Sequence, residues 1–82
     1  MISKNYWHDK FCIVTGAASG IGFETSKLLI SEGAKVLGLD KSPAVGTVKA
    51  IFSASNNPYE VCDLSKPQEI EAVFRSFTDS KL

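Results

Sequence analysis

The chain has 82 residues, of which 44% are hydrophobic and 22% charged, which is the composition of an ordinary globular protein rather than a disordered one. Nine basic residues balance nine acidic ones, so the charge gives no reason to expect a nucleic acid or an anionic membrane as a partner. No apolar run approaches the roughly 20 residues of a membrane helix, and residues 1–10 lack the apolar core of a signal peptide. These features favour a cytoplasmic protein and one domain, or part of one, over residues 1–82.

The first predicted elements are a strand, a glycine-rich turn and a helix. Residues 11–14 form a short apolar run, which fits a strand covered on both faces. After the turn at residues 16–20, apolar residues recur at helical spacing. The residues expected on the inner face of this helix are Ile21, Thr25, Leu28 and Leu29. We expect the helix to end at Gly33, because glycine readily adopts a left-handed conformation.

A second strand is predicted over residues 36–39, and it ends in Asp40. The pair Ser42-Pro43 is expected to start a short helix, although Gly46 and Thr47 weaken that interpretation. The inner side of this helix would carry Ala44, Val48, Ile51 and Phe52. The run Asn56-Asn57-Pro58 is typical of a turn.

A third strand is predicted over residues 59–62, ending at Asp63. Ser65, followed three residues later by Gln68, indicates a capping box that starts a last helix. The apolar stripe expected along that helix consists of Ile70, Val73, Phe74 and Phe77. Strands that alternate with helices are joined by right-handed crossovers. We therefore predict an α/β fold, a Rossmann-like parallel sheet of three strands in the order 3-2-1 with flanking helices.

The two cysteines, Cys12 and Cys62, fall on strands that should flank a third strand. Two strand spacings of about 4.8 Å exceed the ~7 Å limit on the Cα separation of a disulfide. Neither cysteine has a histidine or a second cysteine at metal-ligand spacing. Both are interpreted as buried apolar residues, and no metal site is predicted.

Glycine and acidic residues stand where the predicted strands end. Open parallel sheets bind ligands at the carboxyl ends of their strands. The glycines have the spacing G-x-x-x-G-x-G, in which Gly16 allows a sharp exit from the strand. Gly20 and Gly22 allow close approach to a helix N-terminus, where free N–H groups and the helix dipole favour a phosphate.

Asp40 comes about 20 residues after the glycine turn, where a carboxylate can accept hydrogen bonds from the hydroxyls of an adenosine ribose. The same carboxylate would repel a 2′-phosphate, so NAD(H) is favoured over NADP(H). The neighbouring Lys41 could partly accommodate that phosphate, which leaves NADP(H) as the less favoured alternative.

The segment 15–22, TGAASGIG, resembles the cofactor-binding motif TGxxxGIG of the short-chain dehydrogenases/reductases at every defined position. Gly33-Ala34, Asp40 and Asp63-Leu64-Ser65 also stand where that family has its GA, its acidic residue and its D-[LV]-[ST]. The resemblance covers about residues 10–77. It implies that Ser19, Gly20 and Ile21 line the pyrophosphate, Asp40 holds the ribose, and Asp63 and Leu64 face the adenine. The complete predicted cofactor site is Gly16, Ser19, Gly20, Ile21, Gly22, Asp40, Lys41, Asp63 and Leu64.

The catalytic part of that family has no counterpart in this chain. Its NNAG segment, its catalytic serine and its YxxxK motif do not occur, apart from a formal match at Tyr6 and Lys10 that we interpret as chance. No catalytic residue is therefore predicted. By resemblance, the chain is the N-terminal part of an oxidoreductase that transfers a hydride between a nicotinamide cofactor and an alcohol or carbonyl substrate. Full-length relatives are commonly homo-oligomers.

Three other interpretations fit the sequence less well. A P-loop needs a Gly-Lys-[Ser/Thr] that the helix start lacks, and a methyltransferase turn has glycines at closer spacing. The serious alternative is a truncated, non-catalytic module that binds a nucleotide or a protein. In the predicted sheet the first strand lies at an open edge, so the isolated chain is expected to be marginally stable or self-associating.

Overall fold

The computed structural model describes residues 6–81. Strands and helices alternate along the chain, as predicted. The elements are β1 (Phe11–Thr15), α1 (Gly20–Ser31), β2 (Lys35–Asp40), α2 (Gly46–Ala54), β3 (Tyr59–Val61) and α3 (Pro67–Lys81). No helix in residues 6–81 is both long enough and apolar enough to cross a membrane.

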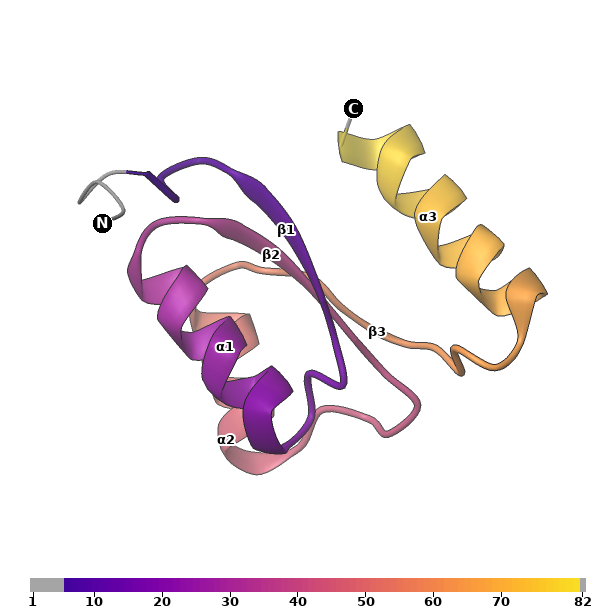
Figure 1. Cartoon of the computed structure of the whole chain (residues 1–82), viewed down its shortest axis with the longest axis horizontal. Helices are drawn as coiled ribbons and strands as arrows, with labels where there is room; N and C mark the ends of the chain where they lie inside the picture. The colour runs from indigo at the N-terminus through magenta and orange to yellow at the C-terminus, as the bar shows by residue number, and fades with distance from the viewer. Residues whose placement is uncertain (1–5, 82) are drawn as a thin grey trace.

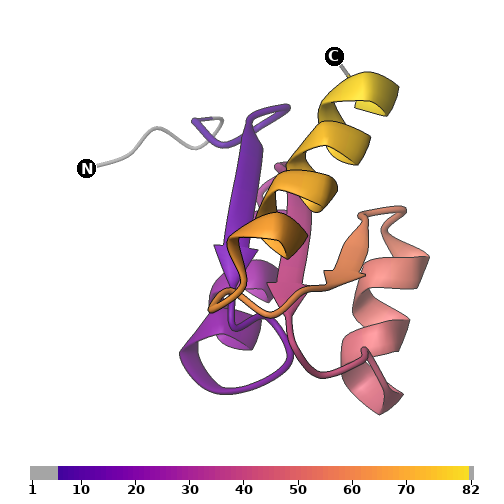
Figure 2. The same ribbon diagram turned by 90° about the vertical axis from the view of Figure 1, so that its right-hand side faces the viewer.

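The strands form one parallel sheet with β2 in the centre, so the predicted strand order is confirmed. Ile13 of β1 lies opposite Leu37 of β2, and Gly38 of β2 lies opposite Tyr59 of β3. Helices α1 and α2 cover one face of the sheet and α3 lies on the other (Figures 1 and 2). All the strands therefore end at the same edge, and the loops that follow them are brought together there.

Two apolar clusters, one on each face of the sheet, hold the layers together. The cluster under α1 and α2 contains Val14, Ala17, Ala34, Val36 and Phe52. The cluster under α3 contains Leu37, Leu39 and Cys62, with Ile70 and Val73 of the helix packed against it. Successive residues of β2 thus enter opposite clusters, which explains why this strand is an unbroken apolar run.

The prediction that β1 is covered on both faces is wrong. Phe11 and Ile13 remain 57% and 47% exposed, while Val14 on the other face is buried. The reason is the position of α3, whose apolar residues pack over Leu37, Leu39 and Cys62 rather than over β1. One apolar face of the edge strand is therefore open to solvent.

The predicted inner face of α1 is also wrong in part. Ile21 is 87% exposed and Leu28 and Thr25 are exposed as well, whereas Ser26 is buried and Leu29 packs on the core. The helix touches the sheet at Gly22, and the buried Ser26, one turn later, donates its hydroxyl to the carbonyl of Gly22 at 2.9 Å. Close approach at this point requires small residues, which a search for apolar periodicity does not detect. The predicted helix end at Gly33 is confirmed, with φ +87°.

Both remaining helices begin later than the sequence predicts. Helix α2 starts at Gly46 rather than at Ser42-Pro43, because the segment after Asp40 first forms an irregular turn against the carboxylate. Its expected inner residues Val48, Ile51 and Phe52 are at least partly buried.

Helix α3 starts at Pro67, and the predicted capping box of Ser65 and Gln68 is not formed. Ser65 instead donates to Asp63, and Glu69 Oε1 accepts the N–H of Asp63 at 2.9 Å. Proline tolerates the first helical position because an N–H there would have no intrahelical acceptor. Phe74 stays exposed, and the side chain of Phe77 lies outside the described part of the structure.

Candidate functional site

The loop from β1 to α1 is shaped by its glycines. Gly16 has φ +66° and Gly20 has φ +59°, a backbone conformation that residues with a side chain rarely adopt. Position 22 requires glycine for a steric reason instead, because a Cβ there would overlap the carbonyl oxygen of Gly16. The loop therefore turns sharply out of β1 and brings the start of α1 against the strand end.

Backbone and side-chain hydrogen bonds fasten this loop to the end of β2. The N–H of Ala17 donates to the carbonyl of Leu39 at 3.1 Å. The next N–H, of Ala18, donates to Oδ2 of Asp40, also at 3.1 Å. The other carboxylate oxygen, Oδ1, accepts the N–H of Ser42 at 2.9 Å. Asp40 is thus held between the glycine loop and the segment that follows β2.

The N-terminus of α1 presents backbone N–H groups without a side-chain cap. Ser19 occupies the N-cap position in an extended conformation, yet its hydroxyl makes no capping hydrogen bond. No acidic side chain stands in the first turn of the helix. The first N–H groups of a helix have no intrahelical acceptor and lie at the positive end of the dipole. This end of α1 therefore favours an anion.

The segment after β3 forms the other wall of the site. Ser65 donates both its N–H, at 3.0 Å, and its hydroxyl, at 2.7 Å, to Oδ1 of Asp63. These hydrogen bonds, the hydroxyl one first, lower the pKa of Asp63; burial opposes them, and the nearby Lys66 and Lys41 lower the pKa further. Asp63 is therefore a fixed negative charge at neutral pH.

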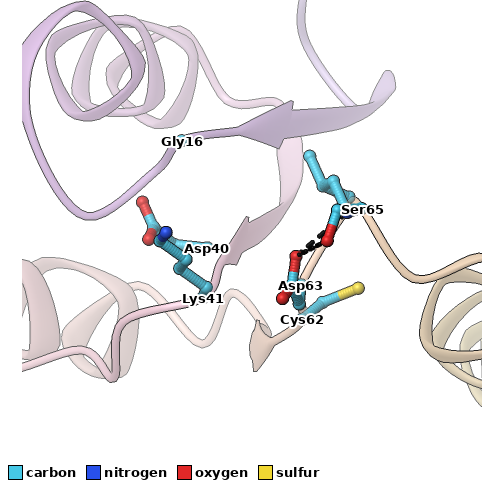
Figure 3. A pocket seen from close by; sticks show the side chains of 7 residues that line it. Gly16, Asp40, Lys41, Cys62, Asp63 and Ser65 are labelled. Carbon is cyan, nitrogen blue, oxygen red and sulfur yellow. Dashed lines mark hydrogen bonds between the residues drawn. The ribbon is translucent and has the colours of Figure 1, made fainter.

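A pocket of about 240 Å³ opens where these loops meet. It is lined by Gly16, Asp40, Lys41, Cys62, Asp63, Leu64 and Ser65. Figure 3 shows Asp40 and Lys41 near the loop at Gly16, with Asp63 hydrogen-bonded to Ser65 on the other side of the pocket. Complete ligand pockets usually measure about 300–1,000 Å³, so this one has room for only part of a large ligand.

The structure brings five of the predicted site residues into this pocket, namely Gly16, Asp40, Lys41, Asp63 and Leu64. The remaining four, Ser19, Gly20, Ile21 and Gly22, lie at the start of α1 and do not line it. They begin α1, directly after the loop that leaves β1 at Gly16. Predicted residues thus occupy both a pocket and a neighbouring helix N-terminus.

Two lining residues were not predicted as part of the site, Cys62 and Ser65. Cys62 was correctly expected to be buried and unpaired, since it is a free cysteine with 1% exposure. Burial, with Glu69 and Asp63 as further causes, raises the pKa of its thiol, and the side chain packs in the apolar cluster under α3. Ser65 could have been found from its place two residues after Asp63, because a serine there can hold the carboxylate.

The parallel sheet, the glycine loop and the acidic residue at the end of β2 together define a class of dinucleotide-binding α/β domain. Residues 10–80 match the family of short chain dehydrogenases, and the chain belongs to that family. It is 43% identical over 67 residues to the short-chain dehydrogenase/reductase olcF of Penicillium canescens, covering 79% of this chain and 24% of that protein.

Similar proteins extend beyond this one relative. The chain is 34% identical over 70 residues to the 3-oxoacyl-[acyl-carrier-protein] reductase FabG of Vibrio cholerae, covering 85% of this chain and 29% of that protein. The crystal structure of a short chain dehydrogenase from Leptospira borgpetersenii with bound NAD⁺ superposes with a TM-score of 0.78 at 25% identity, over 98% of this chain and 31% of the other. The chain therefore spans only 24–31% of the length of these proteins.

Proposed function

We propose that this chain binds the adenosine diphosphate half of a nicotinamide dinucleotide and selects NAD(H) over NADP(H). In the longer protein it would be the cofactor-binding portion of an oxidoreductase that transfers a hydride between the nicotinamide and an alcohol or carbonyl substrate. The observation that carries the proposal is the fixed carboxylate of Asp40, held by backbone N–H groups at the mouth of a pocket formed by strand ends.

The pyrophosphate would lie at the start of α1, against the backbone of Ser19, Gly20 and Ile21. The uncapped N–H groups and the absence of an acidic residue in the first turn support this placement. Gly22 allows the helix start to remain close to the strand end, so that a phosphate here would lie within reach of the neighbouring pocket.

The adenosine would occupy the pocket. A carboxylate has about four acceptor positions, and the two N–H groups of the chain use two of those on Asp40, leaving the others for a ribose diol. A 2′-phosphate would instead meet a negative charge that two backbone N–H groups hold in place. Lys41 lies beside Asp40, but its side chain is exposed, and water weakens its attraction for that phosphate. The bound NAD⁺ of the Leptospira relative agrees with this preference.

The adenine ring would lie between Cys62 and Leu64, with Asp63 at its edge. Both hydrogen bonds from Ser65 end on Oδ1 of Asp63, so Oδ2 is the oxygen proposed to accept from the adenine amino group. Cys62 lines the pocket, but its side chain is buried in the cluster under α3. The pocket volume of about 240 Å³ fits a part of the dinucleotide rather than the whole.

The chain itself would not transfer the hydride. A catalytic group must reach the substrate oxygen beside the nicotinamide, at the carboxyl ends of the strands. Tyr6 and Lys10, the formal YxxxK match, contact each other with the ammonium 5.2 Å from the ring centroid. Both precede β1 and so lie at the opposite end of the sheet from Asp40. The substrate-binding and catalytic groups would come from the rest of the longer protein.

Calorimetric titration with NADH and NADPH tests the proposal, with circular dichroism to show that the chain is folded. NADH should bind weakly but measurably, and Asp40→Ala should weaken it about five- to 150-fold, corresponding to about 1–3 kcal/mol. Glu60→Ala, which removes an exposed carboxylate from β3 outside the pocket, is the control and should change little. A folded chain that binds neither dinucleotide would contradict the proposal and favour a protein-interaction module.

A further inference from the structure

Tyr59, the first residue of β3, does not line the pocket but is linked to it. Its hydroxyl donates a hydrogen bond of 2.6 Å to the carbonyl oxygen of Ser42. Its ring packs edge-on against Phe52 of α2, with 5.3 Å between the ring centroids and an interplanar angle of 72°. The ring is therefore fixed from the core side while the hydroxyl reaches the segment that follows β2.

The hydrogen bond from Tyr59 continues toward the glycine loop. Ser42 accepts the tyrosine hydroxyl through its carbonyl and donates its own N–H to Oδ1 of Asp40 at 2.9 Å. The second oxygen, Oδ2, accepts the N–H of Ala18 at 3.1 Å. A continuous series of hydrogen bonds thus joins β3, the segment after β2 and the loop before α1.

The backbone and the side chain of Asp40 are held by different partners. Its carbonyl accepts the N–H of Cys62 at 2.8 Å, a bond to the segment after β3 that fixes the main chain at the strand end. The direction of the carboxylate depends instead on the N–H groups of Ser42 and Ala18. Ser42 is exposed and lies between β2 and α2, outside any helix or strand. The position of its N–H therefore depends on what holds its carbonyl.

We propose that Tyr59 is a positioning residue for cofactor selection: through Ser42 it holds the Asp40 carboxylate in the orientation that accepts a ribose diol and repels a 2′-phosphate. This inference rests on the proposed function and adds to it a residue outside the pocket. Burial, and then the charge of Asp40, raise the pKa of Tyr59, so the phenol keeps its proton and remains a donor at neutral pH.

The test compares Tyr59→Phe with Val48→Ala. Tyr59→Phe removes the hydroxyl and keeps the ring that packs on Phe52. Val48, like Tyr59, is partly buried against the same apolar cluster, but it takes no part in the hydrogen bonds to Asp40. The measured quantity is the ratio of the dissociation constants for NADPH and NADH, with amide hydrogen exchange of Ser42 as a readout that needs no cofactor.

Tyr59→Phe should weaken NADH about three- to tenfold, leave NADPH within about twofold, and speed exchange of the Ser42 amide. Val48→Ala should lower the melting temperature without changing the ratio. Equal losses for both dinucleotides, an unchanged ratio, or the same ratio change in Val48→Ala would overturn the inference. If the unaltered chain binds neither dinucleotide, the proposed function fails first and the inference fails with it.

Discussion

The N–H of Ala18 and the carboxylate of Asp40 are 22 positions apart in the sequence, yet they form a hydrogen bond of 3.1 Å. This bond connects the glycine loop after β1 with the end of β2. It places a negative charge beside the N-terminus of α1, which favours an anion. The N-terminus of α1 therefore favours a phosphate, whereas the Asp40 carboxylate beside it would repel one. This contrast underlies the predicted preference for a cofactor without a 2′-phosphate.

Replacing Asp40 by asparagine should invert or abolish the cofactor preference without removing the side chain's volume. The amide keeps one oxygen that can accept from Ala18 or Ser42, but the charge that repels a 2′-phosphate is gone. We expect NADH to weaken about five- to 100-fold and NADPH to strengthen, as measured by calorimetry. Asp9→Asn, at an exposed carboxylate that precedes β1, should leave both affinities unchanged. A parallel loss for both dinucleotides would contradict the role of the charge.

Gly22→Ala should destabilise the fold more than Gly46→Ala. A Cβ at position 22 would overlap the Gly16 carbonyl, and its nearest neighbours are backbone atoms of Thr15 and Gly16 rather than a flexible side chain, so we expect a loss of about 3 kcal/mol or more. A Cβ at Gly46 meets open space and costs only the strain of φ +57°, about 1–2 kcal/mol. Urea denaturation of both variants measures the difference. Equal losses would contradict the close approach of α1 to β1.

Ser65→Ala should raise the pKa of Asp63 toward its ordinary value. The pKa is lowered mainly by the two hydrogen bonds from Ser65, of which the variant keeps only the backbone one. A carboxyl whose pKa is lower in the folded state contributes stability above its unfolded pKa, and that contribution disappears as the pH falls through the folded value. The variant should therefore lose this contribution at a higher pH than the original chain. An NMR titration of the Asp63 carboxyl carbon measures the shift, and an unchanged pKa would contradict the assignment.

Ile13→Lys should reduce self-association of the chain. Ile13 and Phe11 expose apolar surface on β1, the strand at the open edge of the sheet. Exposed apolar edge strands pair readily with other chains, and an edge lysine discourages this. Sedimentation velocity should show association of the original chain that weakens in Ile13→Lys. Leu28→Lys, at an exposed apolar position of α1, should leave association unchanged. A concentration-independent monomer before substitution would contradict the expectation.

Much of the fold could be predicted because β2 and the glycine turn carry local signals. Val36 enters one apolar cluster and Leu37 and Leu39 the other, and a strand buried on both faces typically shows such an apolar run. The pocket residues Asp40 and Asp63 could be predicted because parallel strands end at one edge. The inner face of α1 could not, since its contact with the sheet uses Gly22 and Ser26 rather than large apolar side chains.

The starts of α2 and α3, and the hydrogen bonds that hold the Asp40 carboxylate, depend on contacts between distant segments. Ser42 directly precedes Pro43, and Ser65 stands two positions before Pro67, an arrangement that locally suggests a helix start. In the structure each instead donates to an aspartate that ends or follows a strand, Asp40 and Asp63 respectively. The hydrogen bond from Tyr59 to Ser42 joins residues 17 positions apart and has no local sequence signal. These features follow from the tertiary arrangement of the strand ends.

The most direct test of a cofactor site at the strand ends is an NMR titration of the ¹⁵N-labelled chain with NADH. We expect the largest shift changes at the backbone amides of Gly16, Gly20, Asp40 and Leu64, which belong to the glycine loop, the start of α1 and the two pocket walls. Amides that precede β1, such as those of His8 and Lys10, should change little because they lie at the opposite end of the sheet. Shift changes confined to that opposite end, or none at all in a folded chain, would contradict the proposed site.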